Sequence, residues 1–398
     1  MQFAKRLQPL SSNVFADMDG AKSQAKATGQ EIIDLSLGSS DLPVAEETIA
    51  AIENSLRDAS THGYLLYHGT QDFREAAANW YRDKFGISVN PATEVLQLIG
   101  SQEGTAHLPL ALLDPGDIAL LQDPGYPSHA GGVYLAGGQI YTMPLLAENQ
   151  FLPVLEDIPP SVLTQAKMMV LSYPHNPTAA IAPLSFFQQA VDFCRQHHLV
   201  LVHDFPYVDL VFDGDRQILA PSVLQADRDK ELSIEFFTLS KSYNMGGFRV
   251  GYAIGNSEII RALRQVKAVV DFNQYRGILN GAIAALSGSQ ASVQKTVNIF
   301  KKRRDVFIRA LQDIGWQVQS PQATMYIWAK LPEPWQNNSV EFCTQLVAQT
   351  GVAASPGTGF GKAGEGYVRF ALVREPEVLQ VAAQKIAWFL NHVSPSSI

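Results

Sequence analysis

The stretch from Ile234 to Gly251 reads IEFFTLSKSYNMGGFRVG, and the other features of the chain can be arranged around it. Its apolar start, IEFFTL, predicts a strand, and the polar residues SKS follow at once. The end of a strand would hold the Lys241 amine rigidly, where burial and neighbouring cations lower an ammonium pKa and make the amine nucleophilic. Such an amine can form a Schiff base. A lysine after a strand is more often an exposed turn residue, so the interpretation depends on the rest of the chain.

Composition limits the classes of function. The chain has 398 residues, 46% of them hydrophobic, which is enough for a large domain and a smaller one. The net charge of −8 comes without a basic stripe and excludes a nucleic-acid-binding protein. The N-terminus has no signal-peptide pattern, and no apolar run approaches eighteen residues, so we expect a cytoplasmic protein without a membrane span.

Cysteines and histidines give no metal or disulfide pattern. Cys194 and Cys343 lie on separate predicted helices, which indicates two reduced, packed thiols. The nine histidines show no metal-binding spacing and are interpreted as packing or surface residues. We therefore predict no metal site.

Short, nearly all-apolar strands alternate with helices between residues 95 and 254. This pattern predicts an α/β fold, a three-layer α/β/α domain whose mostly parallel sheet is covered on both faces. After residue 255 the chain reads as helical to about residue 313 and then alternates strands, near 316–319 among others, with helices. We predict an N-terminal arm and part of a small domain over residues 1–42, a large domain over 43–287 and a C-terminal small α+β domain over 288–398.

A phosphate-binding arrangement is predicted where the strand at 95–99 meets Gly100 and a helix opens at Ser101. The free N–H groups and positive dipole end of such a helix favour a dianion, and Ser101 adds a hydroxyl donor. Serine is also a common N-cap without any ligand. Glu103 would repel a phosphate, so we expect its side chain to point away.

Several polar residues follow the ends of predicted strands, where ligands bind in such sheets. A cofactor with an aldehyde, a ring nitrogen and a phenolic oxygen would use them together with Lys241. Asp204 would keep the ring nitrogen protonated, a pairing of roughly 4 kcal/mol at about 4 Å. Asn176 and Tyr207 suit hydrogen bonds to the ring oxygen, and Tyr126 suits stacking on the ring. Each also fits a cap, turn or core position.

One motif is set aside. Gly359, Gly361 and Gly364 match the GxGxxG fingerprint of nicotinamide nucleotide binding. That fingerprint needs a preceding strand and a following helix, whereas a strand-like run, YVRFAL, follows here.

The ordered stretches GSQEG, DPGYP, YPHNPTA, HDFPY, SKSYNMGGFRVG and SPGTGFGKAGEGYVRFAL resemble the fold type I pyridoxal-phosphate enzymes, specifically the class I and II aminotransferases. The resemblance runs from about Leu35 to the last helix. HDFPY departs from the family's common DxAY form, although the spacing of Asp204 and Tyr207 is kept. The likeness extends to the aspartate, alanine and LL-diaminopimelate branches without deciding between them.

The resemblance implies a role for each matching residue. Lys241 would carry the Schiff base with pyridoxal 5′-phosphate, with Asp204 on the pyridine nitrogen and Tyr207 as the third catalytic residue. Asn176 and Tyr207 would hold the ring oxygen, and Tyr126 would stack on the ring. The phosphate would be bound by Ser101, the Gln102 backbone, Thr238 or Ser240, Arg249 and, across a homodimer interface, Tyr64. The substrate α-carboxylate would be bound by Arg369, the Gly38 N–H and Asn176.

The implied activity is transfer of an amino group from an L-amino acid to a 2-oxo acid such as 2-oxoglutarate, by a ping-pong mechanism. The donor stays open among aspartate, alanine, glutamate and LL-diaminopimelate. Asn273, Gln274 and Arg276 are candidates for reading the substrate side chain, and Arg276 equally fits a surface salt bridge.

Two alternatives remain. The same cofactor chemistry would serve a lyase that eliminates a β-substituent from a sulfur amino acid. A ligand-sensing protein without turnover is the second, but such proteins usually carry a DNA-binding domain, and we expect no room for one before Leu35.

Overall fold

The computed structural model describes residues 3–10, 14–212 and 220–395. Its centre is a seven-stranded sheet with the strand order β2-β8-β7-β6-β5-β3-β4. Strand β8 runs antiparallel to both of its neighbours, and the remaining pairs are parallel. The strands are β2 (Val95–Leu98), β3 (Ile118–Asp123), β4 (Gln139–Pro144), β5 (Ala166–Ser172), β6 (Val200–Asp204), β7 (Ser233–Thr238) and β8 (Gly251–Gly255). The prediction of a mostly parallel sheet is confirmed.

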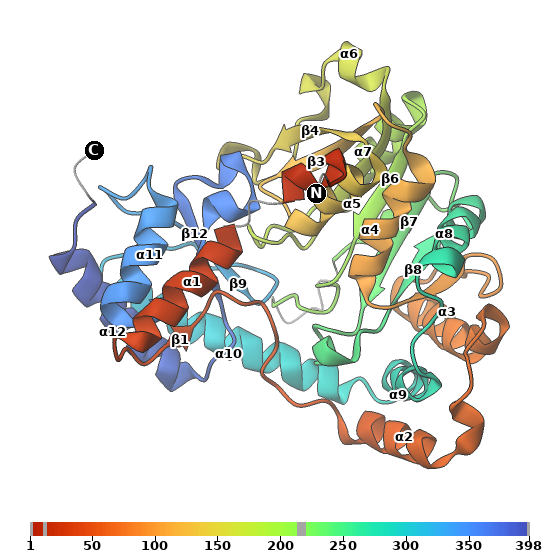
Figure 1. Cartoon of the computed structure of the whole chain (residues 1–398), viewed down its shortest axis with the longest axis horizontal. Helices are drawn as coiled ribbons and strands as arrows, with labels where there is room; N and C mark the ends of the chain where they lie inside the picture. The colour runs from red at the N-terminus through yellow and green to blue at the C-terminus, as the bar shows by residue number, and fades with distance from the viewer. Residues whose placement is uncertain (1–2, 11–13, 213–219, 396–398) are drawn as a thin grey trace.

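Alternating side chains divide the sheet between two hydrophobic cores. Successive residues of a strand point to opposite faces. Val202 and Phe236 therefore join one core, while their neighbours Leu201 and Phe237 join the other. The first core is covered by α4 (Ser101–Leu112), α5 (Pro127–Ala136) and α8 (Ser257–Val270), and the second by α3 (Gln71–Phe85) and α7 (Leu184–Gln196). Figure 1 shows these helices on either side of the sheet, which confirms the predicted three layers.

Two smaller sheets lie to one side of the large one (Figure 1). In the first, β1 (Ile33–Asp34) pairs in parallel with β10 (Val352–Ala353). In the second, β12 (Tyr367–Ala371) lies between β11 (Ser355–Pro356) and β9 (Tyr326–Lys330), antiparallel to both. Residues near the two ends of the chain thus share a sheet, while the domain limits at residues 42 and 287 stay a prediction.

The remaining helices pack around the small sheets or beside the helices of the large sheet. Helices α1 and α11 pack together, as do α10 and α12, and α2 packs on α9. Their bounds are α1 (Val14–Ala27), α2 (Glu46–Arg57), α6 (Pro160–Leu163), α9 (Arg276–Ser287), α10 (Ala291–Asp313), α11 (Ser339–Thr350) and α12 (Pro376–His392). Among the residues that the structure describes, no helix combines the length and apolar character that a membrane crossing requires.

The strand predicted near residues 316–319 is wrong, because this segment pairs with none of the described sheets. Trp316 and Val318 are nevertheless buried, so the alternating pattern reflects packing rather than strand pairing. The Trp316 indole N–H donates to the Lys330 carbonyl at 2.8 Å and holds the segment beside β9.

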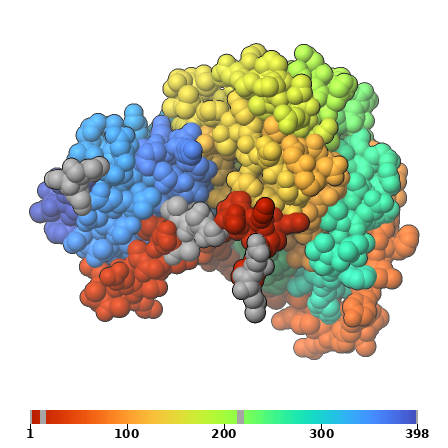
Figure 2. Space-filling model, turned by 45° about the horizontal axis from the view of Figure 1, so that its top comes forward, coloured from red at the N-terminus to blue at the C-terminus, as the bar shows by residue number. Residues whose placement is uncertain are grey.

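The N-terminal residues contact both the part around the seven-stranded sheet and the part around the small sheets. The short 3-10 helix η1 (Lys5–Leu10) lies on α5, where the Arg6 guanidinium donates to the Leu135 carbonyl at 3.1 Å. Figure 2 shows this red segment against the yellow and orange surface of the part around the seven-stranded sheet. Helix α1, a few residues later, packs instead beside α11.

Candidate active site

Lys241 lies three residues beyond β7, at the carboxyl end of the parallel strands. Its side chain is half-buried, and Nζ donates a hydrogen bond of 2.6 Å to the Gly38 carbonyl. The same Nζ lies 5.6 Å from the centre of the Tyr207 ring. The amine is therefore held in place between the large sheet and the loop that follows β1, as a reactive lysine requires.

Asp204 is the last residue of β6 and is almost fully buried. Its Oδ2 lies 3.1 Å from Nε2 of His129, on α5. Its Oδ1 is buried without a hydrogen-bond partner in the described part of the chain. A buried carboxylate oxygen without a donor is costly, so this atom is suited to receive an N–H from a bound ring. The sequence missed His129, whose place three residues after Tyr126 was its only signal.

Arg369 is buried on β12, and its guanidinium meets groups from distant parts of the chain. One nitrogen, Nη1, donates to Oδ1 of Asn176 at 2.8 Å, and Nη2 donates to the Ser36 carbonyl at 2.7 Å. Its Nε is buried without a partner among the described residues. Since none of the described carboxylates pairs with it, this buried guanidinium is a suitable binding group for a carboxylate ligand.

Tyr326, on β9, is a site residue that the sequence analysis missed. Its hydroxyl accepts a hydrogen bond of 2.9 Å from Tyr207, and the Arg369 guanidinium lies 4.2 Å from the centre of its ring. A Cβ at Gly38 would collide with the Tyr326 hydroxyl, so the close approach requires glycine there. No motif marks Tyr326, because it lies inside an ordinary apolar strand.

The charges around the two tyrosines move their pKa values in opposite directions. Burial disfavours the phenolate of Tyr326, but the positive charges of Lys241 and Arg369 and the hydrogen bond from Tyr207 hold its pKa below the ordinary value. Burial, together with Tyr326, raises the pKa of Tyr207 well above the ordinary value. Tyr207 therefore stays protonated and is a hydrogen-bond donor at neutral pH.

The predicted phosphate-binding residues other than Tyr64 lie around the start of α4 and the strand ends beside it. Gly100 precedes Ser101 with a φ of 75°, and a Cβ at Gly100 would collide with the Arg249 guanidinium. The Thr238 hydroxyl donates to the Ser240 hydroxyl at 2.8 Å on the neighbouring strand end. Arg249 is exposed and, among the described residues, forms no ion pair with a carboxylate. Hydroxyls, free helix N–H groups and an available guanidinium together suit a phosphate.

Tyr126 lies between these two parts of the site. Its hydroxyl is 3.5 Å from Oε1 of Gln102, and its ring packs edge-on against His129. Tyr126 thus adjoins both the first turn of α4 and the partner of Asp204.

Tyr64 lies away from Lys241 in this chain. Its side chain is 95% exposed, and its ring lies 6.4 Å from that of Phe272. Within one subunit the structure does not bring Tyr64 to the other site residues.

The three residues proposed to contact the substrate side chain differ in what they touch: Asn273 and Gln274 bond to backbone carbonyls, and Arg276 lies against a glycine. The Asn273 amide donates to the Leu65 carbonyl at 2.7 Å, and the Gln274 amide donates to the Arg249 carbonyl at 3.2 Å. Both amides therefore hold backbone segments. The Arg276 guanidinium lies against Gly69, where an added Cβ would be 2.9 Å from Nη2.

The buried Glu103 carboxylate pairs with Lys267 and accepts the N–H of Ile99, and its expected direction away from a phosphate stays a prediction. Its two carboxylate oxygens accept hydrogen bonds of 2.8 and 3.0 Å from Lys267. Burial disfavours its ionised form, but contacts from His107, Lys267 and the Ile99 N–H hold its pKa below the ordinary value. Glu103 is therefore a carboxylate at neutral pH.

One group of described side chains has metal-like spacing: Glu103, His107 and Asp271. The Lys267 ammonium lies 2.8 Å from an oxygen of each carboxylate and supplies the positive charge. Elsewhere, burial lowers the pKa of His175 to about 3, so this histidine is a neutral packing residue. Cys194 and Cys343 are free and buried, as predicted.

The GxGxxG segment is not a nucleotide-binding turn. Residues 357–364 form two short 3-10 helices and lead directly into β12, with no α-helix in between. Such a turn needs a helix N-terminus for the phosphates.

The chain matches the family described as aminotransferase class I and II over residues 30–386. Among curated proteins it is 42% identical over 389 residues to an LL-diaminopimelate aminotransferase of Dehalococcoides mccartyi, and the alignment covers 98% of this chain and 99% of that protein.

Solved structures agree in fold. A probable N-succinyldiaminopimelate aminotransferase from Thermus thermophilus is 42% identical with a TM-score of 0.89, covering 94% of this chain and 99% of the other. Substrate-bound BacF from Bacillus subtilis is 33% identical with a TM-score of 0.92, covering 98% of each chain.

Proposed function

Because this chain belongs to the class I and II aminotransferase family, we propose that it binds pyridoxal 5′-phosphate at Lys241 and uses a diaminopimelate as amino donor. The observation that carries the cofactor proposal is the Oδ1 of Asp204, which is buried without a hydrogen-bond donor among the described residues. When bound, the cofactor would supply an aldehyde carbon that takes the amino group and a protonated ring that withdraws electrons from the substrate's α-carbon.

The chain's own residues would hold this group at three places. Asp204 would accept the ring N–H, with its other oxygen kept in position by His129. Tyr207, a phenol at neutral pH, would donate to the ring oxygen together with the Asn176 amide nitrogen. Tyr126 would cover one face of the ring.

The phosphate would lie at the start of α4. Ser101 and the Gln102 N–H would donate from the helix, and Thr238 or Ser240 from the end of β7. Arg249 would add a guanidinium whose charge is not already neutralised by a carboxylate of the described chain.

The substrate α-carboxylate would be bound by the fork of Arg369 and by the Gly38 N–H. Lys241 would then act as general base, and its Nζ would take the substrate's α-proton. Gly38 and Lys241 are already joined by a hydrogen bond, so the carboxylate and the base would be held at adjacent positions. Donor and acceptor would use this single site in turn, with ping-pong kinetics.

The donor is inferred from the relatives. Proteins named LL-diaminopimelate aminotransferase are 42% identical over 98% of the chain, so LL-diaminopimelate is the first choice, with 2-oxoglutarate as acceptor. The Thermus relative at equal identity favours N-succinyl-LL-diaminopimelate as the second. The two compounds differ at the distal amine, which is free in the first and acylated in the second.

One experiment tests these proposals together. We expect the purified protein to show a visible absorbance band with pyridoxal phosphate, and LL-diaminopimelate alone to convert it to the band of the aminated cofactor. Conversion by the N-succinyl compound only would favour the second donor. Release of pyruvate and ammonia from an added sulfur amino acid such as cystathionine, without any acceptor, would instead indicate a lyase. The absence of any band would contradict the cofactor assignment.

We also propose a cytoplasmic homodimer in which Tyr64 reaches the phosphate of the neighbouring subunit. Its 95% exposure is compatible with such a contact. Tyr64→Phe should weaken pyridoxal phosphate binding severalfold while light scattering still shows a dimer. Unchanged cofactor affinity in a dimeric Tyr64→Phe protein would contradict the cross-subunit contact.

A further inference from the structure

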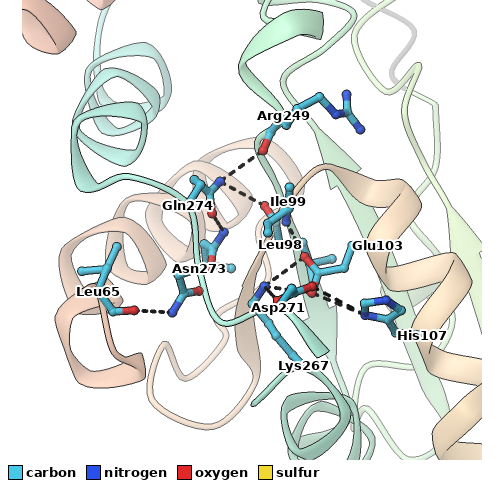
Figure 3. A network of polar contacts seen from close by, with 11 residues as sticks. Leu65, Leu98, Ile99, Glu103, His107, Arg249, Lys267, Asp271, Asn273 and Gln274 are labelled. Atoms are coloured by element: carbon cyan, nitrogen blue, oxygen red, sulfur yellow. Dashed lines mark hydrogen bonds and ion pairs between the residues drawn. The ribbon is translucent and has the colours of Figure 1, made fainter. Parts of the chain in front are cut away.

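A partly buried polar network adjoins the proposed phosphate-binding turn (Figure 3). It begins at Glu103, in the first turn of α4, whose Oε2 accepts the N–H of Ile99 at the strand end. The turn from Ile99 through Gly100 to Ser101 is therefore anchored from inside by a carboxylate. Any displacement of Glu103 would move the helix N–H groups that face the phosphate.

Lys267 compensates the charge of Glu103. Its side chain is 5% exposed, and its Nζ lies within 3.0 Å of both Glu103 oxygens and 2.8 Å from Oδ1 of Asp271. An uncompensated carboxylate at this position would oppose a dianion at the start of the same helix. Removing one partner of a buried ion pair also leaves the other charge buried, which is strongly unfavourable.

Gln274 connects the two halves of the phosphate site. Its Nε2 donates to the Leu98 carbonyl at 3.4 Å and to the Arg249 carbonyl at 3.2 Å, while its Oε1 accepts from Gln97. Leu98 ends β2 and leads into Gly100, and Arg249 precedes β8 with a φ of 53°, in the left-handed region. One side-chain amide therefore bridges the strand that leads to α4 and the backbone that carries the arginine.

We propose that Lys267 and Gln274 are positioning residues that set the affinity for the cofactor's phosphate group. Lys267 acts through Glu103 on the first turn of α4, and Gln274 acts on the backbone of Arg249. The inference rests on the proposed binding of pyridoxal phosphate at Lys241. It differs from a general stabilising role because it predicts a loss that depends on the phosphate.

The test compares pyridoxal phosphate with pyridoxal, which has the aldehyde and ring but no phosphate. Both are titrated into the apoprotein and followed by the absorbance of the adduct at Lys241. In Gln274→Ala we expect the Kd of pyridoxal phosphate to rise about tenfold, as for the loss of one well-placed hydrogen bond, and that of pyridoxal to stay within about twofold. The exposed Gln294→Ala, on α10, is the matched control and should change neither Kd.

Two further variants test the charge. Lys267→Met leaves the Glu103 carboxylate without its ammonium partner. It should raise the Kd of pyridoxal phosphate more than Gln274→Ala does. The double variant Glu103→Gln with Lys267→Met removes the Glu103–Lys267 pair, keeps the partly exposed Asp271 beside His107 and should recover part of that loss. If Lys267→Met does not fold, the double variant is compared directly with the unchanged protein, and its phosphate-specific loss should then be smaller than tenfold.

The outcomes separate the inference from the proposed function. An unchanged protein that forms no adduct with either compound contradicts the proposed function, and the inference with it. If the unchanged protein forms the adduct, the proposed function stands. The inference alone is then overturned if Gln274→Ala raises the Kd of both compounds equally or raises neither.

Discussion

The proposed phosphate end and the proposed carboxylate end of the site are built differently. The phosphate end comes from residues 95–101 and 238–251, which are joined through the pairing of β8 with β2 and β7 in one sheet. At the carboxylate end, Gly38 follows β1, Asn176 follows β5 and Arg369 lies on β12, in three different sheets. Strand pairing sets the geometry of the first end, whereas the packing of separate sheets sets that of the second.

The difference predicts that the two ends can be damaged independently. Changes at the phosphate end should lower the affinity for pyridoxal phosphate. They should leave the affinity of the cofactor-loaded enzyme for its substrate unchanged. Changes at the carboxylate end should do the reverse. Lys241 is the exception, because it follows β7 at one end and bonds to Gly38 at the other.

Lys241→Ala should therefore give the largest effect. Loss of the amine removes both the covalent attachment and the general base, and we expect kcat to fall by roughly 10⁴-fold or more. Amino transfer under saturating pyridoxal phosphate is the measurement, and the visible band should be lost with it. Lys167→Ala, at an exposed position of β5, is the control. A Lys241→Ala protein that keeps its band and its rate would rule out the assignment.

Arg369→Lys should break the carboxylate end alone. A lysine keeps the charge but not the planar fork, and it cannot contact Asn176 and Ser36 together. We expect kcat/KM for the amino donor to fall about 100-fold, within the usual range for a hydrogen-bonded charged group. The Kd of pyridoxal phosphate should change less than about threefold. An equal loss in both quantities would show that the two ends are not independent.

Arg249→Lys should break the phosphate end alone. The lysine loses the fork beside Gly100, so the Kd of pyridoxal phosphate should rise about tenfold. With saturating cofactor, KM for the amino donor should match that of the unchanged protein. A raised KM under those conditions would contradict the separation of the two ends.

Tyr326→Phe should give the smallest change in kcat/KM. It tests the protonation of a residue at the carboxylate end. The pKa of Tyr326 lies below the ordinary tyrosine value, so in the protein without cofactor its phenolate should form at a lower pH than that of other tyrosines. A pH titration of phenolate absorbance should show this early step, and Tyr326→Phe should remove it. The same variant should lower kcat/KM only about threefold, since one hydrogen bond from Tyr207 is lost. An early step that persists in Tyr326→Phe would assign it to another residue.

Sequence reasoning worked best where function depends on local chain order. The strand ends beside Asp204 and Lys241 and the helix start at Ser101 follow from apolar runs of strand length bounded by polar residues and glycine. The sequence predicted from charge repulsion that Glu103 avoids the phosphate but gave no sign of its buried partner Lys267. The expected strand at 316–319 failed because alternating burial can arise without a pairing partner.

The sequence by itself determined the three-layer fold, the order of the strand ends and the family, because these depend on periodicities and motifs within short segments. Only the tertiary structure decided that Tyr326 lies beside Tyr207, that His129 supports Asp204 and that Lys267 compensates Glu103. Each of these pairs joins residues at least 75 positions apart, on different elements. Such contacts depend on how sheets and helices pack, and the identity of the distant partner leaves no periodic signal in the chain.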